Sequence, residues 1–383
     1  MRIGLFADMY LPHISGVTNH IALYKRYFEE RGHEVLVFTF SDADYRDTEA
    51  GIVRSPGIPW GDTGWRFSAG LSAQARRLAE TLDIAHVHHP FQSGRLVAPL
   101  ALRCDIPLAF TNHTRYDLYS DAYARFVPQA ARYGYLRRSL HDLAERCELV
   151  VAPSASIAEW LGQFAHFPGA EVIPNGIDTH AFANPSASVA REELGFSADD
   201  VVFCYAGRLG PEKSTVHLAE EFARACATAP HARLLVIGDG PARVPAQAAL
   251  ASAGLAGRAR FVGMVPYERV PDYEAAADAF VTASVSEVHP LVVLEAMAAG
   301  LPVVATSSPG ISDTIDVGES GLLAPDSAPG ALAERIARIA ADAPLRARLS
   351  AGAREAAGAY ALENTADRLL RRYEALRIGR GPA

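Results

Sequence analysis

The sequence predicts an α/β fold made of two doubly wound domains with a cleft between them. Short apolar runs typical of strands alternate with longer helical patterns, which indicates parallel sheets covered by helices on both faces. The series stops near residue 178 and starts again near residue 200. The chain has 383 residues, of which 49% are apolar and 21% charged, and this length suffices for two domains.

The first predicted domain spans residues 1–178. It opens with the apolar run "RIGLFA", followed by a loop and the helical stretch "NHIALYKRYFEERG". Further apolar runs predict the other strands of its sheet, at residues 33–40, 84–89, 107–113, 149–156 and 170–176. A stretch rich in Ala, Asn, Pro and Ser between about residues 179 and 200 predicts the connection to the second domain.

The second predicted domain spans residues 190–359. Six apolar runs indicate its strands, and helical patterns lie between them and after Pro290. The predicted strands are at 201–209, 233–240, 259–265, 279–284, 302–306 and 321–325. The charged amphipathic segment "ENTADRLLRRYEALR" predicts a helix over 360–378 that packs back on the first domain. Because ligands bind outside the carboxyl ends of strands in such sheets, the loops at those ends are the candidate sites.

The composition excludes several classes of protein. The net charge of −8 argues against general nucleic-acid binding, which needs a basic face. The four cysteines are scattered without metal-ligand spacing and are typical of buried residues in a reducing compartment. The N-terminus lacks a signal-peptide pattern, and no apolar stretch approaches the roughly 20 residues of a membrane span. We expect a cytoplasmic protein.

The stretch "SEVHPLVVLEAMAAGLPVVA" (286–305) predicts a short helix with a glutamate before it and another inside it. Pro290 suits the first helical position, and Gly300 suits the left-handed residue just past the end. Glu287 then precedes the helix N-terminus, beside free backbone N–H groups, and Glu295 lies one to two turns inside. Local sequence alone favours two surface carboxylates. The rest of the chain decides against that interpretation.

Two cations follow the first strand of the second domain, in "YAGRLGPEKS". Arg208 and Lys213 lie in a turn that Gly207 and Gly210 keep open. One forked donor and one point charge together suit a diphosphate. The alternative is a solvated loop with a surface salt bridge to Glu212. The chain has only two lysines, and the position of Lys213 at a strand end favours the diphosphate.

Three other loops offer backbone groups to a ligand. "VIGDGP" lacks the third glycine of the dinucleotide fingerprint and indicates a structural turn. Gly263 and Met264 follow another strand and are candidates to present backbone groups to a nucleobase. Gly16 lies just ahead of the first helix, where its N–H either contacts an anion or belongs to a plain turn.

The histidines divide into two groups. His113 ends a strand in "FTNHTRYDLY", a position that is more often functional than one on an apolar helix face. His86, His88 and His89 lie in or beside another strand. Strand alternation sends neighbours to opposite faces, and no Cys or carboxylate joins these three at ligand spacing. We therefore expect structural roles for them and no metal site.

Together these motifs resemble a family-4 retaining glycosyltransferase of the GT-B fold, in which two Rossmann-like domains face a central cleft. The resemblance covers nearly the whole chain. Its most specific part is the E-x7-E pattern from Glu287 to Glu295, followed by "AMAAGLPVVA". The segments "GVTNHI", "HTRYDLY", "IPNGID", "GRLGPEK" and "GDGP" support it in the expected order.

The resemblance implies a nucleotide-diphosphate sugar as donor, similar to UDP-glucose, and a hydroxyl acceptor, with no cofactor and no metal required. Glu295 would accept hydrogen bonds from the ribose hydroxyls, and Glu287 would hold the donor sugar. Arg208 and Lys213 would stabilise the departing diphosphate, whose charge grows in the transition state. His113 would contact the sugar near its 6-hydroxyl. The remaining implied donor contacts are Gly16, Gly207, Gly263, Met264, Leu291 and Val292.

One departure from the family pattern concerns the donor sugar. The family has a Phe-Gly pair two to three places after the first glutamate, and here the pair is His289-Pro290. Proline removes a backbone N–H, so the contacts pass to the N–H groups of Leu291 and Val292. We interpret His289 as a residue that replaces part of the lost contact.

The acceptor is predicted from "HTRYDLY", which is closest to enzymes that glycosylate diacylglycerol-type lipids. Arg115, Tyr116 and Asp117 are then the acceptor contacts. The Tyr/Arg-rich stretch of residues 116–138 either lies on the anionic inner face of the cell membrane or forms a helical pair with core aromatics and solvated arginines. A soluble sugar or metabolite acceptor stays open. So does a GT-B nucleotide-sugar epimerase, which needs no acceptor.

Overall fold

The computed structural model describes residues 1–41, 46–47, 49–59, 66–326 and 328–379. The chain divides into two compact units. The first unit comprises Met1–Ser120, Ala124–Gly176 and Leu362–Ala383, and the second comprises Asp121–Tyr123 and Ile177–Ala361.

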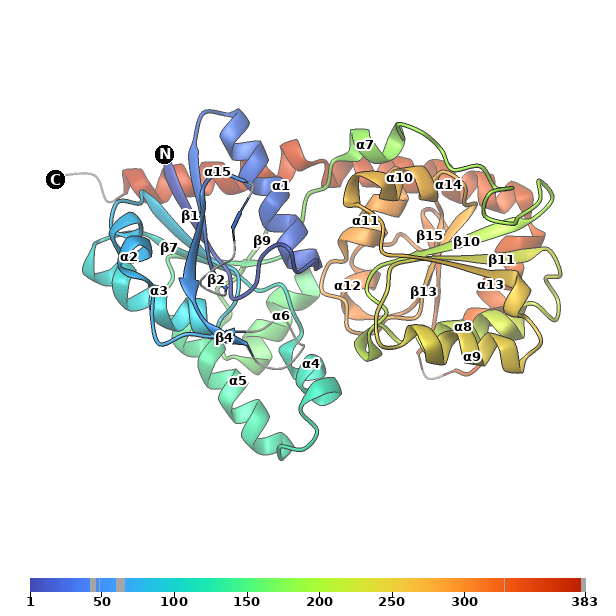
Figure 1. The fold of residues 1–383 in the computed structure, drawn as a ribbon, viewed down its shortest axis with the longest axis horizontal. Coiled ribbons are helices and arrows are strands. Elements are labelled where there is room, and N and C mark those ends of the chain that lie inside the picture. The colour runs from blue at the N-terminus through green and yellow to red at the C-terminus, as the bar shows by residue number, and fades with distance from the viewer. Residues whose placement is uncertain (42–45, 48, 60–65, 327, 380–383) are drawn as a thin grey trace. The chain divides into compact units, whose positions relative to one another are not determined.

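The described part of the first unit contains a seven-stranded parallel sheet in the order β3-β2-β1-β6-β7-β8-β9 (Figure 1). Its strands are β1 (Arg2–Phe6), β2 (Glu34–Ser41), β3 (Ile52–Pro56), β6 (Ile84–Val87), β7 (Leu108–Thr111), β8 (Leu149–Ala152) and β9 (Glu171–Val172). β4 (Ile58–Pro59) and β5 (Arg66–Phe67) form a separate antiparallel pair. The apolar runs of the sequence predict β1, β2, β6, β7, β8 and β9. They do not predict β3, β4 or β5.

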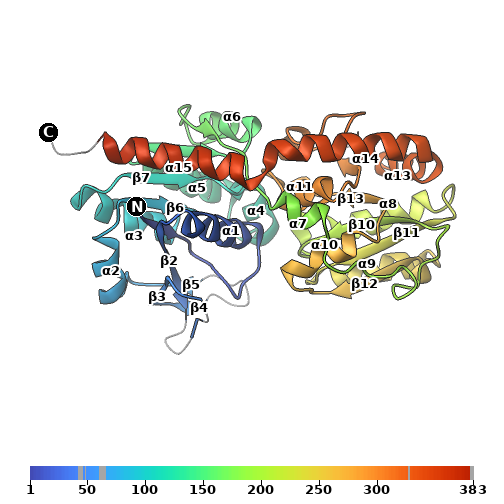
Figure 2. The ribbon, with the colours of Figure 1, turned by 90° about the horizontal axis from the view of Figure 1, so that it is seen from above.

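Helices cover both faces of this sheet. They are α1 (Gly16–Glu30), α2 (Ala73–Ala79), α3 (Gln92–Arg103), α4 (Tyr116–Tyr123), α5 (Gln129–Ala144), α6 (Ala155–Phe164) and α15 (Leu362–Ile378). α15 runs along the sheet beside α1 (Figure 2), where Tyr27 Oη donates to Asp367 Oδ1 over 2.7 Å. Phe6 and Phe38 stack at 4.3 Å between centroids on the opposite face, against which α3 packs. The last helix of the sequence is therefore part of the first unit.

The second unit contains a six-stranded parallel sheet in its described residues, in the order β12-β11-β10-β13-β14-β15. The strands are β10 (Val201–Ala206), β11 (Ala232–Ile237), β12 (Ala259–Gly263), β13 (Ala279–Thr282), β14 (Val303–Thr306) and β15 (Gly321–Ala324). All six coincide with predicted apolar runs. β10, β13 and β14 are buried throughout, which is typical of strands that are covered on both faces, whereas the edge strand β12 is partly exposed.

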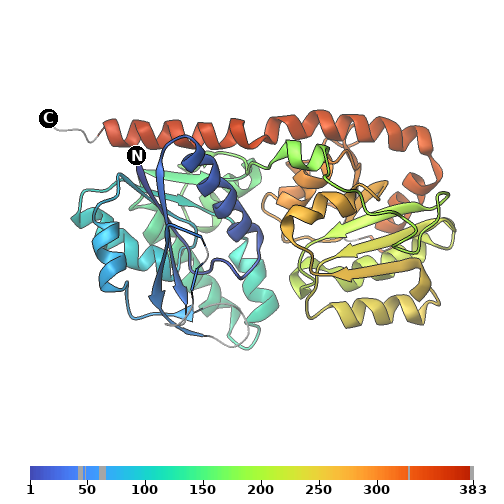
Figure 3. The ribbon, with the colours of Figure 1, turned by 45° about the horizontal axis from the view of Figure 1, so that its top comes forward.

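Two helical layers enclose this second sheet. The helices are α7 (Thr179–Ala183), α8 (Thr215–Ala225), α9 (Arg243–Ser252), α10 (Val270–Glu274), α11 (Leu291–Ala298), α12 (Pro309–Ser312), α13 (Ala331–Ala341) and α14 (Ala343–Ala357). α8, α9 and α13 pack on the face that includes Phe203, with α8 and α9 seen in yellow tones in Figure 3. α7, α11 and α14 pack on the face that includes Cys204 and Phe280. Phe182 of α7 belongs to this second core, so part of the segment predicted as a connection is folded into the second unit.

Candidate active site

The strand order of the second sheet locates its candidate site. Counted from β10, the order is 3-2-1-4-5-6, and the direction of winding reverses between β10 and β13. Ligands in doubly wound sheets bind at the carboxyl ends of the two strands that flank such a reversal. The loop after β10 carries Arg208 and Lys213, and the loop after β13 carries Glu287.

A salt bridge between Lys213 and Glu287 joins these two loops. The distance from Nζ to Oε1 is 2.8 Å, although the residues are 74 positions apart in the sequence. Ser286 Oγ adds a second link, because it donates to the backbone oxygen of Glu212 over 2.9 Å. The side chains of Lys213 and Glu287 are 29% and 11% exposed. Two residues that the sequence singled out separately thus form one pair at the reversal of the sheet.

The turn that carries Arg208 is held by close backbone packing. Gly207 has φ +137°, and a Cβ on Gly238 would lie 2.0 Å from the backbone oxygen of Gly207. Tyr205 Oη donates to the backbone oxygen of Arg208 over 3.0 Å. The loops after β10 and β11 are therefore fixed against each other, and Arg208 is held half-buried at the end of β10.

Glu295 lies within α11 and is 2% exposed. Its Oε1 accepts a hydrogen bond of 2.7 Å from Tyr267 Oη, and Oε2 has no partner among the described residues. Burial raises the pKa of Glu295 to about 7, and the hydrogen bond from Tyr267 partly opposes this rise. Glu274 is fully buried, and burial raises its pKa well above the usual range, with Glu295 adding to the rise. Glu274 is therefore a neutral neighbour, and Glu295 is the carboxyl that ionises near neutral pH.

The helix that carries Glu295 begins and ends much as its sequence predicts. Pro290 is the N-cap, with φ −75° and ψ 116°, so the prediction that it occupies the first helical position is wrong by one residue. At the other end Gly300 has φ +81°, as predicted. Gly300 N–H donates to Met297 O and Leu301 N–H to Ala296 O, which is the Schellman arrangement.

The N-terminus of α11 offers free donors. The first two helical N–H groups belong to Leu291 and Val292, and among the described residues neither has a hydrogen-bond partner. Such groups, together with the helix dipole, favour an anionic or hydroxyl ligand. His289 just before them is 5% exposed and packs on Tyr360 at 5.2 Å between centroids. Most of the His289 ring is therefore enclosed by the second unit, which leaves little of it for the sugar contact that we interpreted from the sequence.

Gly263 and Met264 follow β12. The backbone oxygen of Gly263 accepts a hydrogen bond of 2.8 Å from Gly238 N–H, so the fold already uses this carbonyl. Met264 is 56% exposed. Of the two residues predicted to present backbone groups to a nucleobase, Met264 has the more accessible position.

In the first unit, Gly16 is the first residue of α1 rather than the residue ahead of it. Ser15 is the N-cap. Its Oγ accepts from Thr18 N–H over 3.2 Å, and Thr18 Oγ1 accepts from Ser15 N–H over 2.8 Å. This capping box leaves the Gly16 N–H pointing out of the helix end, and a Cβ at Gly16 would meet no atom within 4 Å. The position suits an anion contact.

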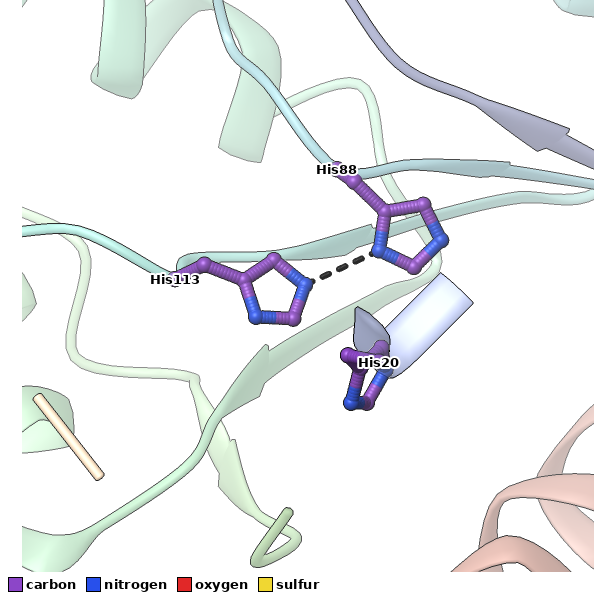
Figure 4. Close-up of side chains that lie close together, drawn as sticks. All are labelled: His20, His88 and His113. Atoms are coloured by element: carbon purple, nitrogen blue, oxygen red, sulfur yellow. Dashed lines mark hydrogen bonds between the residues drawn. The ribbon is translucent and has the colours of Figure 1, made fainter. Parts of the chain in front are cut away.

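His113 lies beside two other histidines (Figure 4). His113 Nε2 and His88 Nδ1 are 2.9 Å apart, and the His20 ring lies 4.7 Å from the His113 ring between centroids. One ring nitrogen from each residue lies within 4.8 Å of the other two. Burial lowers the pKa of His20 to about 3 and the pKa values of His88 and His113 well below their usual range, with the neighbouring imidazoles adding to the effect. All three rings are therefore neutral at neutral pH.

The other two histidines of "AHVHHP" have the structural roles that the sequence indicates. The His86 ring nitrogens contact Tyr373 Oη and, over 2.8 Å, Thr111 Oγ1, which ties α15 to the sheet. His89 Nδ1 accepts from Asp8 N–H over 3.2 Å. Strand alternation did not reveal the arrangement of His88, because one of its partners comes from a helix far away in the sequence.

The predicted acceptor residues lie at the start of α4. Arg115 forms a two-pronged ion pair with Asp117, with distances of 2.9 and 2.7 Å. Its guanidinium carbon also lies 5.1 Å from the centroid of the Trp160 ring. Tyr116 is 4% exposed and packs on Phe91. Arg115 and Asp117 thus stabilise the local fold through each other, and Tyr116 offers little surface to an acceptor.

The sequence interpretation missed two residues that the structure places in these sites. Tyr267 contacts Glu295, and it could have been suspected only because it lies in the loop after β12. His20 contacts the His113 cluster from α1, where it resembles an ordinary buried position on a helix. Both contacts join segments that no local pattern connects.

Comparisons with known proteins agree with this architecture. A model described as Glycosyltransferase Family 4 matches residues 14–181, and one described as Glycosyl transferases group 1 matches residues 187–356. An alpha-monoglucosyldiacylglycerol synthase from Acholeplasma laidlawii is 29% identical over 84% of each chain. A D-inositol 3-phosphate glycosyltransferase from Geodermatophilus obscurus is 31% identical over 94% of this chain and 84% of its own.

A solved structure shows the same fold. The Anabaena protein Alr3699/HepE, in complex with UDP and glucose, superposes with a TM-score of 0.78 at 20% identity, over 98% of this chain and 100% of its own. The order of strands, the two parallel sheets and the two matching family models lead to one conclusion. The chain belongs to the family-4, group 1 glycosyltransferases and has their two-domain GT-B fold.

Proposed function

We propose that this glycosyltransferase moves a hexose from a UDP-glucose-like donor to the hydroxyl of a diacylglycerol-type lipid, with retention of the anomeric configuration. The donor assignment rests on a group of charged side chains near the point where the strand order of the second sheet reverses. Arg208 follows β10, the Lys213–Glu287 pair joins the loops after β10 and β13, and the Tyr267–Glu295 pair lies on α11, whose N-terminus has free N–H groups. This group combines cations for a diphosphate with carboxylates for hydroxyls.

Each donor contact follows from the chemistry of its side chain. Glu295 has one oxygen engaged by Tyr267 and a second without a partner among the described residues, which suits the adjacent hydroxyls of a ribose. Glu287 is proposed to hold hydroxyls of the sugar, and the N–H groups of Leu291 and Val292 to contact phosphate or sugar. From the first domain, the N–H of Gly16 and the ring of His113 are proposed to contact the distal phosphate and the sugar 6-hydroxyl.

The proposed reaction breaks the bond between the anomeric carbon and the diphosphate oxygen. The acceptor oxygen bonds to the same face of that carbon, and the acceptor proton passes to the departing diphosphate. Negative charge grows on the diphosphate as it leaves, and Arg208 and Lys213 stabilise it. No metal ion and no cofactor is required in this proposal, because these two cations and the helix N-terminus supply the positive potential.

The segment made of α4, α5 and the loop between them supports a membrane acceptor. Phe126 is 81% exposed and Tyr135 is 62% exposed, and Arg125, Arg137 and Arg138 are exposed on the same segment. Exposed aromatic and basic side chains together suit the interface of an anionic bilayer. In the described parts of the chain, every helix is too short or too polar to cross a membrane. We therefore propose peripheral contact with the inner face of the cell membrane.

A second candidate is transfer to a soluble acceptor. It is favoured by the similarity to a D-inositol 3-phosphate glycosyltransferase, which covers more of this chain than the similarity to the lipid enzyme does. A GT-B nucleotide-sugar epimerase is a further alternative, which would turn over without acceptor.

A donor screen with and without acceptors tests the proposal. UDP-, GDP- and ADP-hexoses are incubated with diacylglycerol in mixed micelles, with inositol phosphate and with no acceptor, and nucleoside diphosphate release is measured. The proposal expects release that depends on diacylglycerol and a product whose anomeric proton has the configuration of the donor. Acceptor-independent conversion of the sugar would indicate the epimerase, and an inverted product would contradict retention.

A further inference from the structure

Three neutral imidazoles from separate segments converge in the first unit. His20 lies on α1, His88 follows β6 and His113 follows β7 (Figure 4). β6 is the strand beside β1 where the order of the first sheet reverses, so the group lies where doubly wound sheets bind ligands. The ligand atoms of the three rings all lie within 4.8 Å of one another.

Several nitrogens of this cluster have no partner. His20 is 4% exposed, and among the described residues neither of its ring nitrogens makes a hydrogen bond. His88 is 1% exposed, and its Nε2 is likewise without a partner in the described chain. Buried polar atoms without hydrogen-bond partners are rare in folded proteins, because a missing hydrogen bond lowers the stability of the fold. The His20 ring, with both nitrogens unpaired, lies 4.7 Å from the His113 ring between centroids and beside the hydrogen-bonded His88–His113 pair, which indicates that a ligand completes the cluster.

The chemistry of the three rings favours a transition metal. Neutral imidazole, with a lone pair on one nitrogen, is the form that binds metal ions, and burial keeps all three rings in it. Imidazole suits Zn²⁺, Co²⁺, Ni²⁺ and Cu²⁺, whereas Mg²⁺ and Ca²⁺ prefer oxygen ligands. Three histidines with a fourth, open position form a known type of Zn²⁺ site.

The geometry requires only a small adjustment. Nitrogens that lie about 2.0–2.1 Å from a tetrahedral ion are roughly 3.4 Å apart. His88 and His113 are already at 2.9 Å, so an ion would separate them slightly and draw the His20 ring closer. His113 is the half-exposed member and provides the side from which an ion or a water enters.

We propose that His20, His88 and His113 form a binding site for one divalent transition metal ion of the Zn²⁺ class. The ion is not needed for sugar transfer. Because His113 is also the proposed sugar contact, an ion held by the cluster occupies that ring and inhibits turnover. This inhibitory consequence rests on the proposed function, whereas the binding itself does not.

Binding is tested with Co²⁺ on the intact chain, prepared without a polyhistidine tag. Co²⁺ bound by three imidazoles and a water absorbs strongly in the visible range, and we expect saturation at one ion per chain. His20→Ala and His113→Ala are each expected to weaken binding at least 100-fold. His217→Ala, a helical histidine of the second unit, is the control and should bind like the unchanged protein.

The variants must keep their fold for this result to count. His20 stacks on Tyr24 at 4.0 Å between centroids, so its replacement could destabilise the fold, and a melting curve accompanies every titration. His113→Ala is the second variant, because His113 is only half-buried. Absence of the visible bands in the folded, unchanged protein overturns the proposal. So does binding that both variants retain, because the ion then lies elsewhere.

Turnover separates this proposal from the proposed function. Zn²⁺ is expected to inhibit transfer, and a chelator to restore it. If Co²⁺ binds at the cluster while no sugar transfer is found, the metal site stands and the proposed function fails. If transfer occurs but Co²⁺ does not bind, the metal proposal is wrong. The lone pairs of the three rings then accept hydrogen bonds from the sugar or acceptor hydroxyls.

Discussion

Tyr267 donates its phenolic O–H to Oε1 of Glu295 over 2.7 Å, and so holds in place a carboxyl group that is only 2% exposed. The bond joins the 3₁₀ turn after β12 to the middle of α11. A carboxylate oriented in this way can accept hydrogen bonds from two adjacent hydroxyls without reorganising.

Glu295→Ala is expected to weaken the binding of free UDP by about 1–3 kcal/mol, since hydrogen bonds to a charged group are lost. Isothermal titration calorimetry measures the change. Glu334→Ala, at an exposed position of α13, is the control and should leave the affinity unchanged. Because Glu295 is buried at a cost in free energy, its removal should not lower the melting temperature. Unchanged UDP affinity would show that Glu295 does not bind the ribose.

The affinity for UDP is expected to fall as the pH is lowered through about 7, the pKa of Glu295, because the protonated group accepts hydrogen bonds poorly. The folded-state pKa lies above the usual value of 4.5, so the stability associated with this group is present below pH 4.5 and is lost as the pH rises through 7. Ligand binding and folding therefore change in opposite directions with pH.

Calorimetry between pH 5.5 and 8.5, a range of about 1.5 units on either side of that pKa, tests this dependence. Tyr267→Phe removes a hydrogen bond that lowers the pKa of Glu295 and should move the midpoint upward. Glu295→Gln should remove the dependence. A pH profile that is equally steep in Glu295→Gln would assign the titration to another group.

Arg208→Ala and Lys213→Ala are each expected to lower turnover by about 100-fold or more, because both cations stabilise charge that grows on the departing diphosphate. Lys213→Ala also leaves Glu287 without its salt-bridge partner, so Lys213→Ala/Glu287→Gln is the second variant to measure. Recovery of turnover in the double variant would mean that Lys213 acts only by neutralising Glu287. Near-normal turnover of a folded single variant would remove that residue from the catalytic group.

A chelator is expected to leave turnover intact or to raise it, because the proposed reaction needs no metal and the metal site proposed at His20, His88 and His113 would be inhibitory. Turnover with EDTA, and then with Mg²⁺ or Mn²⁺ added back, measures this. Complete loss with EDTA that Mg²⁺ or Mn²⁺ reverses would contradict the metal-free reaction.

Local rules account for much of the fold. The strands of both sheets except β3 follow from apolar runs, because the inner parallel strands are buried on both faces. The end of α11 was predictable from Gly300, since a single residue with positive φ decides it. β3 was missed because its sequence, "IVRSP", alternates with polar residues at the edge of the sheet. The short β4 and β5 were missed because two residues carry no periodicity.

The sites were less predictable than the fold. Lys213 and Glu287 were identified separately, yet their contact across 74 positions depends on which strands are neighbours in the sheet. Tyr267 and His20 lie on segments whose local patterns show nothing unusual. Their roles arise from packing between distant segments, and a single sequence does not display such contacts.

The last prediction concerns the acceptor surface. The protein is expected to sediment with vesicles that contain anionic lipid, but not with purely zwitterionic vesicles, and to be released as the salt concentration rises. Each arginine near an anionic surface contributes about 1 kcal/mol, an attraction that salt screens. Arg125→Gln/Arg137→Gln/Arg138→Gln should abolish sedimentation, because these exposed arginines flank Phe126 and Tyr135.

Arg132 is kept in this variant because it is half-buried and contacts Ser120 Oγ, so that replacing it would disturb the fold. Arg26→Gln/Arg76→Gln/Arg77→Gln is the matched control: it removes the same charge from exposed positions on α1 and α2 and should sediment normally. The net charge of −8 opposes approach to an anionic surface, so only a local patch can produce the expected binding. Slow hydrolysis of the donor should be equal in both variants, since it involves none of these arginines. Absence of vesicle binding at low salt, together with efficient transfer to a soluble acceptor, would exclude the lipid acceptor and leave the glycosyltransferase assignment unchanged.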